Sequence, residues 1–168
     1  EREPDVPVAS ASGLYATADG PWRGPGATVT LAALPGKGGS PVTGIVYSID
    51  SGAQQAYSEP FSIPAAGEHS VEYWAENAVG NVAQTKTGYL RIDAAGPSCT
   101  PLDRVAVRRR AKAAFRYRLT DPAPSCGLAR ATIFIYHGRR LVKSFRGEAQ
   151  PVGASYRLSR TMVLPRGR

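Results

Sequence analysis

The chain has 168 residues, of which 42% are hydrophobic and 20% are charged, and this apolar content is sufficient for packed cores. No apolar run approaches the roughly 18 residues that a membrane-spanning helix needs. With two histidines and no pair of carboxylates that stands out, the composition does not favour an enzyme.

Charge divides the chain into two parts. Residues 1–96 contain 5 Lys/Arg and 10 Asp/Glu, whereas residues 97–168 contain 16 Lys/Arg and 3 Asp/Glu. A change of this size indicates two modules with different surfaces. We place the boundary in the Gly/Pro/Ala-rich segment 93–99. Because the chain begins with Glu1 rather than Met, we expect it to be part of a longer protein.

Short segments of the first half alternate apolar and polar residues, which is the pattern of half-buried strands. Residues 27–33 place apolar side chains on one face and threonines on the other. Residues 44–50 follow the same pattern, with Ser48 on the outward face. We expect Ser51 and Gly52 to turn the chain after them.

Residues 69–76, with the sequence HSVEYWAE, give the clearest strand prediction. Odd-numbered residues form an apolar face, and the even-numbered ones, Ser70, Glu72, Trp74 and Glu76, are predicted to face solvent. This is a period of two over eight residues, and helical periodicity fits none of these segments.

The following residues 76–81, ENAVGN, are predicted to form a hairpin loop in which Gly80 and Asn81 take positive φ. Residues 83–93 then give a last strand, with a β-bulge expected at Gly88. The segment 69–81 is thus a core strand followed by a turn.

The second half repeats this style. Residues 113–119 place aromatic side chains on one face and arginines on the other. Residues 131–145 are predicted to form a hairpin that turns at His137 and Gly138. Residues 155–164 give a further strand, and no segment of either half indicates a helix.

The first half resembles a bacterial Ig-like repeat of multidomain secreted and surface proteins. The matching pieces are ATVTLAA (27–33), GIVYSIDSGAQQAYSEPFSIPAAGEHSVEYW (44–74), ENAVGN (76–81) and TGYLRID (87–93). Together they cover nearly all of residues 5–93. The chain departs from the repeat at Glu76, where Asp is usual, and at Val79, where Ala is usual. The resemblance implies that Glu76 accepts hydrogen bonds from loop amides.

The second half resembles a related Ig-like domain through weaker motifs. The chain is therefore predicted to be all-β, with tandem Ig-like antiparallel β-sandwiches at residues 1–93 and 99–168 and a linker at 94–98. Gly67 corresponds to Gly167, after which only one residue remains. We therefore expect the second sandwich to lack about two C-terminal strands, and to be poorly ordered or completed by a neighbouring molecule.

The two cysteines, Cys99 and Cys126, lie in turn-like sequences and form no CxxC pair, so a zinc site is unsupported. Either they form a disulfide or they remain two thiols. A disulfide would close a loop of about 27 residues and would imply an oxidising, extracellular setting.

No metal, cofactor or catalytic set is predicted. The acidic residues considered as calcium ligands are scattered and form no D-x-D-x-D run; they are Asp5, Asp19, Asp50, Glu76 and Asp93. His69 is expected to play a structural role near a sheet corner, and His137 to be exposed in a turn.

Basic residues gather at two predicted turns and along outward faces of the second half. The candidate anion-binding residues are Arg108, Arg109, Arg110, Lys112, Arg139, Arg140, Lys143 and Arg146. They form either a solvated basic face or a site for an anionic cell-surface polymer. Nucleic acid is disfavoured, because the interleaved Phe115 and Tyr117 are predicted to point into the core rather than toward bases.

Trp22 and Trp74 are candidate glycan contacts, and packing against a loop or a neighbouring domain is the alternative. The prediction for function is a non-catalytic spacer and adhesion module of an extracellular or surface-anchored bacterial protein. Its partners would be neighbouring domains of the same longer chain. The rival functions are a carbohydrate-binding accessory module and a basic module that binds anionic cell-surface polymers.

Overall fold

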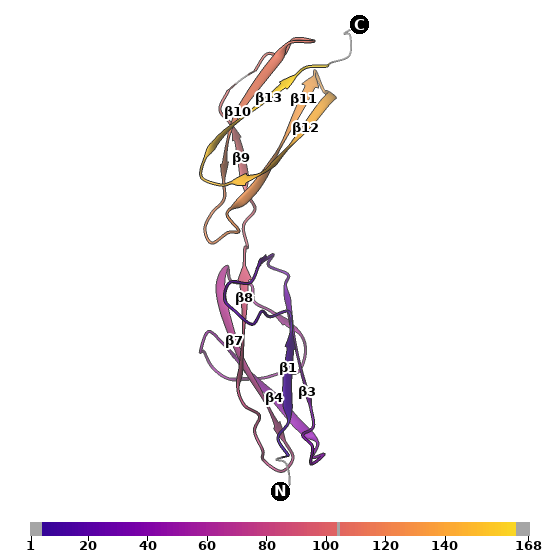
Figure 1. The fold of residues 1–168 in the computed structure, drawn as a ribbon, viewed down its shortest axis with the longest axis vertical. Helices are drawn as coiled ribbons and strands as arrows, with labels where there is room; N and C mark the ends of the chain where they lie inside the picture. The colour runs from indigo at the N-terminus through magenta and orange to yellow at the C-terminus, as the bar shows by residue number, and fades with distance from the viewer. Residues whose placement is uncertain (1–4, 104, 164–168) are drawn as a thin grey trace. The chain divides into compact units, whose positions relative to one another are not determined.

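The computed structural model describes residues 5–103 and 105–163. These residues form thirteen strands and no helix, which confirms the prediction of an all-β protein with several sheets (Figure 1). Nothing in this part of the chain is a long apolar helix that could cross a membrane. The chain divides into two compact units, residues 1–94 and 95–168, and each is described by itself.

The first unit contains two sheets, one with the strand order β1-β3-β6 and the other with the order β2-β8-β7-β4-β5. The strands are β1 (Val8–Ser12), β2 (Trp22–Arg23), β3 (Thr28–Leu34), β4 (Val42–Ile49), β5 (Gln55–Ala56), β6 (Phe61–Ser62), β7 (Gly67–Asn77) and β8 (Lys86–Ile92). Among the described residues, β2 and β8 pair in parallel and the other neighbours pair antiparallel.

The two sheets of the first unit pack against each other through their alternating apolar residues. Val29 and Leu31 of β3 are buried in one cluster with Val71 of β7 and with Leu90 and Ile92 of β8. Burying such side chains contributes roughly 1.5–3 kcal/mol each, so this cluster is the main stabilising feature of the unit. The predicted inward faces of these strands are confirmed.

The outward face of β4 is less exposed than predicted. Ser48, expected to face solvent, is only 4% exposed, and its hydroxyl donates to Glu72 Oε2 at 3.4 Å. The reason is that Ser48 lies directly opposite Glu72 in the β4–β7 pairing, where the longer Glu72 side chain reaches the Ser48 hydroxyl.

The turn after β4 falls one residue earlier than predicted. Asp50 and Ser51 take the positive φ values of 52° and 57°, and the Gly52 amide donates to the Ile49 carbonyl at 2.9 Å. Asp tolerates this conformation better than most residues, and here its carboxylate accepts a hydrogen bond from the Ser70 amide at 2.8 Å.

The loop after β7 is held by Asn77, and the expectation that Glu76 holds it is wrong. Asn77 Oδ1 accepts hydrogen bonds from the Val79 and Asn81 amides at 3.2 and 2.9 Å. The alternation of β7 buries Asn77 and leaves Glu76 on the outward face. Gly80 has φ 83°, as predicted, whereas Asn81 does not have positive φ.

Gly88 does not form a bulge. It pairs with Val71 inside an uninterrupted β7–β8 register. Instead, a Cβ at this position would lie 2.7 Å from Leu14 Cδ1 and 2.8 Å from Leu14 Cβ. The glycine therefore makes room for Leu14, which packs against the core cluster.

The second unit contains a three-stranded sheet with the order β13-β10-β9 and a hairpin, β11-β12. The strands are β9 (Ser98–Pro101), β10 (Lys112–Thr120), β11 (Leu128–His137), β12 (Arg140–Pro151) and β13 (Ser155–Thr161). The hairpin is confirmed, since His137 pairs with Arg140 and Gly138 in the turn has φ 58°. β9 begins at Ser98, inside the predicted linker 94–98.

The sheet and the hairpin of the second unit also pack face to face. Tyr117 and Leu119 of β10 form a buried cluster with Ala129 and Ala131 of β11. This arrangement is sandwich-like. Gly167, on which the expected truncation depends, lies outside the described residues.

Candidate anion-binding surface

The outer face of the three-stranded sheet in the second unit is basic. Because Tyr117 and Leu119 point into the core, the alternate residues Arg116 and Arg118 of β10 are exposed on the other face. The β10–β13 register places Arg116 directly opposite Arg157. Like charges in directly opposite positions destabilise a sheet. The repulsion between Arg116 and Arg157 is therefore reduced only if an acidic side chain or a bound anion lies beside them.

The compensation for Arg116 comes from Asp103. Arg116 Nε and Nη2 donate to the two carboxylate oxygens of Asp103 at 2.6 and 2.7 Å. The hydrogen bonds from Arg116 hold the pKa of the Asp103 carboxyl below its ordinary value. Arg157 has no such partner among the described residues, so its guanidinium remains available to an anion.

A hollow of about 410 Å³ opens beside Arg157 on this face. Ala114 and Ser159, two small residues, lie opposite each other, and the longer side chains of Lys112 and Arg157 flank them. The lining residues are Lys112, Ala113, Ala114, Arg157 and Ser159, none of which is acidic. An ammonium, a guanidinium and a hydroxyl together suit a phosphate, sulfate or carboxylate group.

The predicted anion-binding residues come from three parts of the unit: the turn before β10, the start of β10 and the β11–β12 hairpin. Arg108, Arg109 and Arg110 lie in the turn before β10, where the Arg110 amide donates to the Met162 carbonyl at 2.7 Å. Lys112 begins β10 and lines the hollow. The remaining four belong to the β11–β12 hairpin; they are Arg139, Arg140, Lys143 and Arg146.

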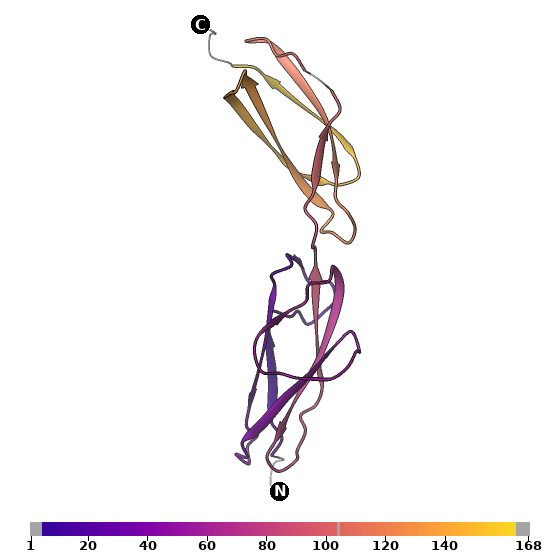
Figure 2. The same cartoon turned by 180° about the vertical axis from the view of Figure 1, so that it is seen from behind.

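Both basic turns nevertheless lie at the same end of the second unit. The start of β10 and the tip of the β11–β12 hairpin are seen together there from both sides (Figures 1 and 2). Arg108, Arg109, Arg110, Arg139 and Arg140 are all exposed. This end therefore extends the basic surface beyond the hollow.

Sequence reasoning missed Arg157 and Ser159. Both lie on the outward face of the alternating segment 155–161, so the sequence pattern could have predicted the face on which they lie. Their position beside Lys112 follows from the pairing of β13 with β10, two strands that are not consecutive in the chain.

Trp22 and Trp74 do not form a joint platform for a sugar. Arg91 lies over the Trp22 ring at 4.5 Å, and Trp74 packs against the core cluster. Trp22 pairs with Arg91, which is opposite Glu68 in β7. The distance along β7 from Glu68 to Trp74 is about 20 Å, too far for both rings to contact one sugar.

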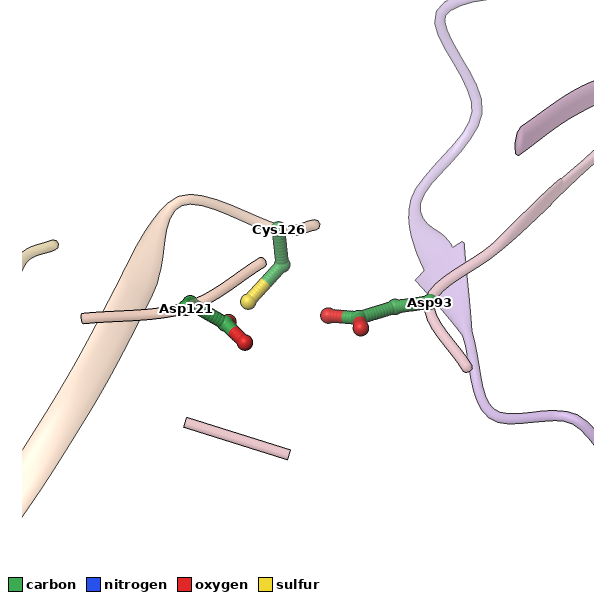
Figure 3. Close-up of side chains that lie close together, drawn as sticks. All are labelled: Asp93, Asp121 and Cys126. Atoms are coloured by element: carbon green, nitrogen blue, oxygen red, sulfur yellow. The ribbon is translucent and has the colours of Figure 1, made fainter. Parts of the chain in front are cut away.

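Cys99 and Cys126 are not bonded to each other in the structure, so the disulfide stays a prediction. Cys99 lies opposite Leu119 near the end of β10, and Cys126 lies in the loop that follows this strand. In this loop Cys126 Sγ lies within 4.8 Å of the Asp121 carboxylate (Figure 3). Two ligands from the second unit are too few for a structural zinc site.

His69 is a structural residue of the first unit, which agrees with the role expected for it. Its Nδ1 lies 2.7 Å from Asp50 Oδ2 and its Nε2 lies 3.0 Å from the Ala65 carbonyl oxygen. Both ring nitrogens thus already face an acceptor within the protein, which favours a structural role over that of a general base. A hollow of about 200 Å³ lies beside this pair.

The His69–Asp50 pair predicts an acid-sensitive contribution to stability. Burial alone would raise the pKa of the Asp50 carboxyl, but hydrogen bonds from His69 and from the Ser70 amide hold it below its ordinary value of 3.8. The stabilisation is therefore complete above this value and is lost as the pH falls through the lower folded pKa. Urea unfolding from pH 6 to 2 should show a shallower acid loss for Asp50→Asn than for the wild type. Equal slopes would contradict this.

Comparison of the chain with protein-family models and with curated proteins finds no match.

Proposed function

We propose that the chain is a non-catalytic module of an extracellular or surface-anchored bacterial protein, and that its second unit adheres to an anionic cell-surface polymer. The observation that carries the proposal is the hollow between Lys112 and Arg157, which has basic and hydroxyl groups but no acidic group in its lining. The first unit would act as a spacer, since its best-defined polar contacts serve to hold its own loops.

A polymer suits this surface better than a single small anion. The hollow is open, and the exposed arginines of the two turns continue the positive charge at one end of the unit. A linear polyanion engages several such cations at once, so individually weak contacts combine into useful affinity. Release of its counterions would make the binding strongly dependent on salt.

The proposal includes an Ig-like assignment for both units. It is supported by the motifs of residues 27–93 and by two sandwich-like units with related strand orders. In such a protein the partners of these units would be neighbouring domains of the same longer chain. A disulfide between Cys99 and Cys126 would fit the extracellular setting and would stabilise the unit by roughly 3–4 kcal/mol.

The test measures binding of the full chain to poly(glycerol phosphate), with uncharged dextran as the control polymer. We expect Lys112→Ala combined with Arg157→Ala to weaken binding about tenfold at low salt and to reduce its salt dependence, because two polymer contacts are lost. Binding isotherms at several salt concentrations, recorded by biolayer interferometry, give both quantities.

A matched variant separates the hollow from net charge. Arg139→Ala combined with Lys143→Ala also removes two positive charges, but from the hairpin. We expect this variant to weaken binding less than the variant of the hollow does. Equal losses for the two variants would show that only the overall charge matters. Absence of binding by the wild type would overturn the proposal.

A further inference from the structure

The two units use corresponding strands in the same order along the chain. In the first unit β1, β3 and β6 form one sheet, while β4 and β5 pair in the other. In the second unit β9, β10 and β13 form one sheet, while β11 and β12 pair in the other. By position in the chain and in the sheets, β11 therefore corresponds to β4 and β12 to β5.

This correspondence reveals an open strand edge. β4 is paired on both sides, with β5 on one edge and β7 on the other. β11 pairs with β12, but within residues 95–103 and 105–163 no strand pairs with its second edge. Unpaired N–H and C=O groups along such an edge are a template for another strand.

The side chains around this edge are also less covered than those of the first unit. Tyr47 of β4 is buried, whereas Ile133 and Ile135 on the inward face of β11 are only half-buried. On the outward face Phe134 and Tyr136 are 54% and 58% exposed. Aromatic side chains exposed next to an open edge mark an interaction surface.

The first unit shows what covers such an edge. β7 places Tyr73 and Ala75 over the core and sets Glu72 and Trp74 on the outward face, where Trp74 lies opposite Val46 of β4. An apolar inner face and an outer face with acidic and aromatic residues thus complete this side of the sandwich.

We propose that the open edge of β11 binds an antiparallel strand of a partner polypeptide that alternates apolar with acidic side chains. Its backbone would pair with the open edge, and its apolar residues would cover Ile133 and Ile135. Its acidic residues would face Arg130, which is exposed on the outward face of β11. The excess of 16 Lys/Arg over 3 Asp/Glu in residues 97–168 favours an acidic partner.

The probe is a fluorescein-labelled peptide with the sequence of residues 67–77, GEHSVEYWAEN, which has this chemistry. We expect it to bind the full chain about tenfold more tightly than a peptide of the same composition whose alternation has been permuted. Fluorescence anisotropy measures both affinities. Hydrogen exchange should show slower exchange of amides in β11 on addition of the first peptide only.

Each other outcome overturns the inference. Equal binding of the two peptides would show attraction by charge alone. Protection of β10 and β13 instead of β11 would place the peptide on the basic face, and protection in the first unit would indicate exchange with β7. Absence of binding would show that the edge takes no such strand. The double variant Lys112→Ala and Arg157→Ala alters the hollow but not β11, so it should retain peptide binding. A failure of the polymer proposal can therefore be distinguished from a failure of this one.

Discussion

Replacement of Asn77 by Ala is expected to lower the free energy of unfolding of the first unit by about 3 kcal/mol. The Asn77 side chain is 3% exposed and makes three hydrogen bonds. Its Nδ2 donates to the Asp5 carbonyl at 2.8 Å, and its Oδ1 accepts from the Val79 and Asn81 amides. Alanine cannot replace these contacts. The Asp5 carbonyl keeps a hydrogen bond from Asn81 Nδ2 at 2.7 Å, but the Val79 and Asn81 amides lose their acceptor, and a buried group left without a partner costs about 1–3 kcal/mol.

Urea denaturation of the two single variants Asn77→Ala and Glu76→Ala tests this assignment. Glu76 lies on the outward face, so its replacement should cost less than about 1 kcal/mol. A loss for Glu76→Ala as large as that for Asn77→Ala would mean that the glutamate holds the loop, as the resemblance to the Ig-like repeat implied.

The strand faces of this protein could be predicted because they are a local property. Side chains alternate along any extended backbone, so Val71 and Tyr73 follow each other into the core whatever β7 pairs with. The same reasoning located the inward face of β10, with Tyr117 and Leu119, and the β11–β12 hairpin.

Features that depend on pairing between distant strands could not be predicted in this way. The hollow arises because Ala114 lies opposite Ser159, and alternation alone does not give this register. For the same reason Lys112 was predicted as an anion-binding residue but Arg157 was not. The burial of Ser48 likewise depends on its position opposite Glu72 in the β4–β7 register.

The close approach of a loop to a strand could not be predicted from the sequence either. An isolated glycine in a strand pattern indicates either a bulge or a close neighbour. At Gly88 the predicted bulge is wrong, and the close neighbour is Leu14. Leu14 lies outside the named strands and far from Gly88 in sequence, so no local pattern joins them. The two explanations predict opposite effects of the same mutation.

Replacement of Gly88 by Ala is expected to destabilise the first unit by about 1–3 kcal/mol, because the added methyl group overpacks the core against Leu14. If the residue were glycine only for backbone freedom at a position without positive φ, alanine would instead stabilise by about 0.4–1 kcal/mol. Urea denaturation of the single variant therefore separates the explanations by sign.

A double-mutant cycle that combines Gly88→Ala with Leu14→Ala shows whether Leu14 is the cause. Leu14→Ala leaves a space in the core that the methyl group added at position 88 can enter. The double variant should therefore lose less stability than the two single variants added together. Strictly additive losses would show that the methyl group does not collide with Leu14. The need for glycine would then originate in the backbone of β8 rather than in the packing of the loop on the sheet.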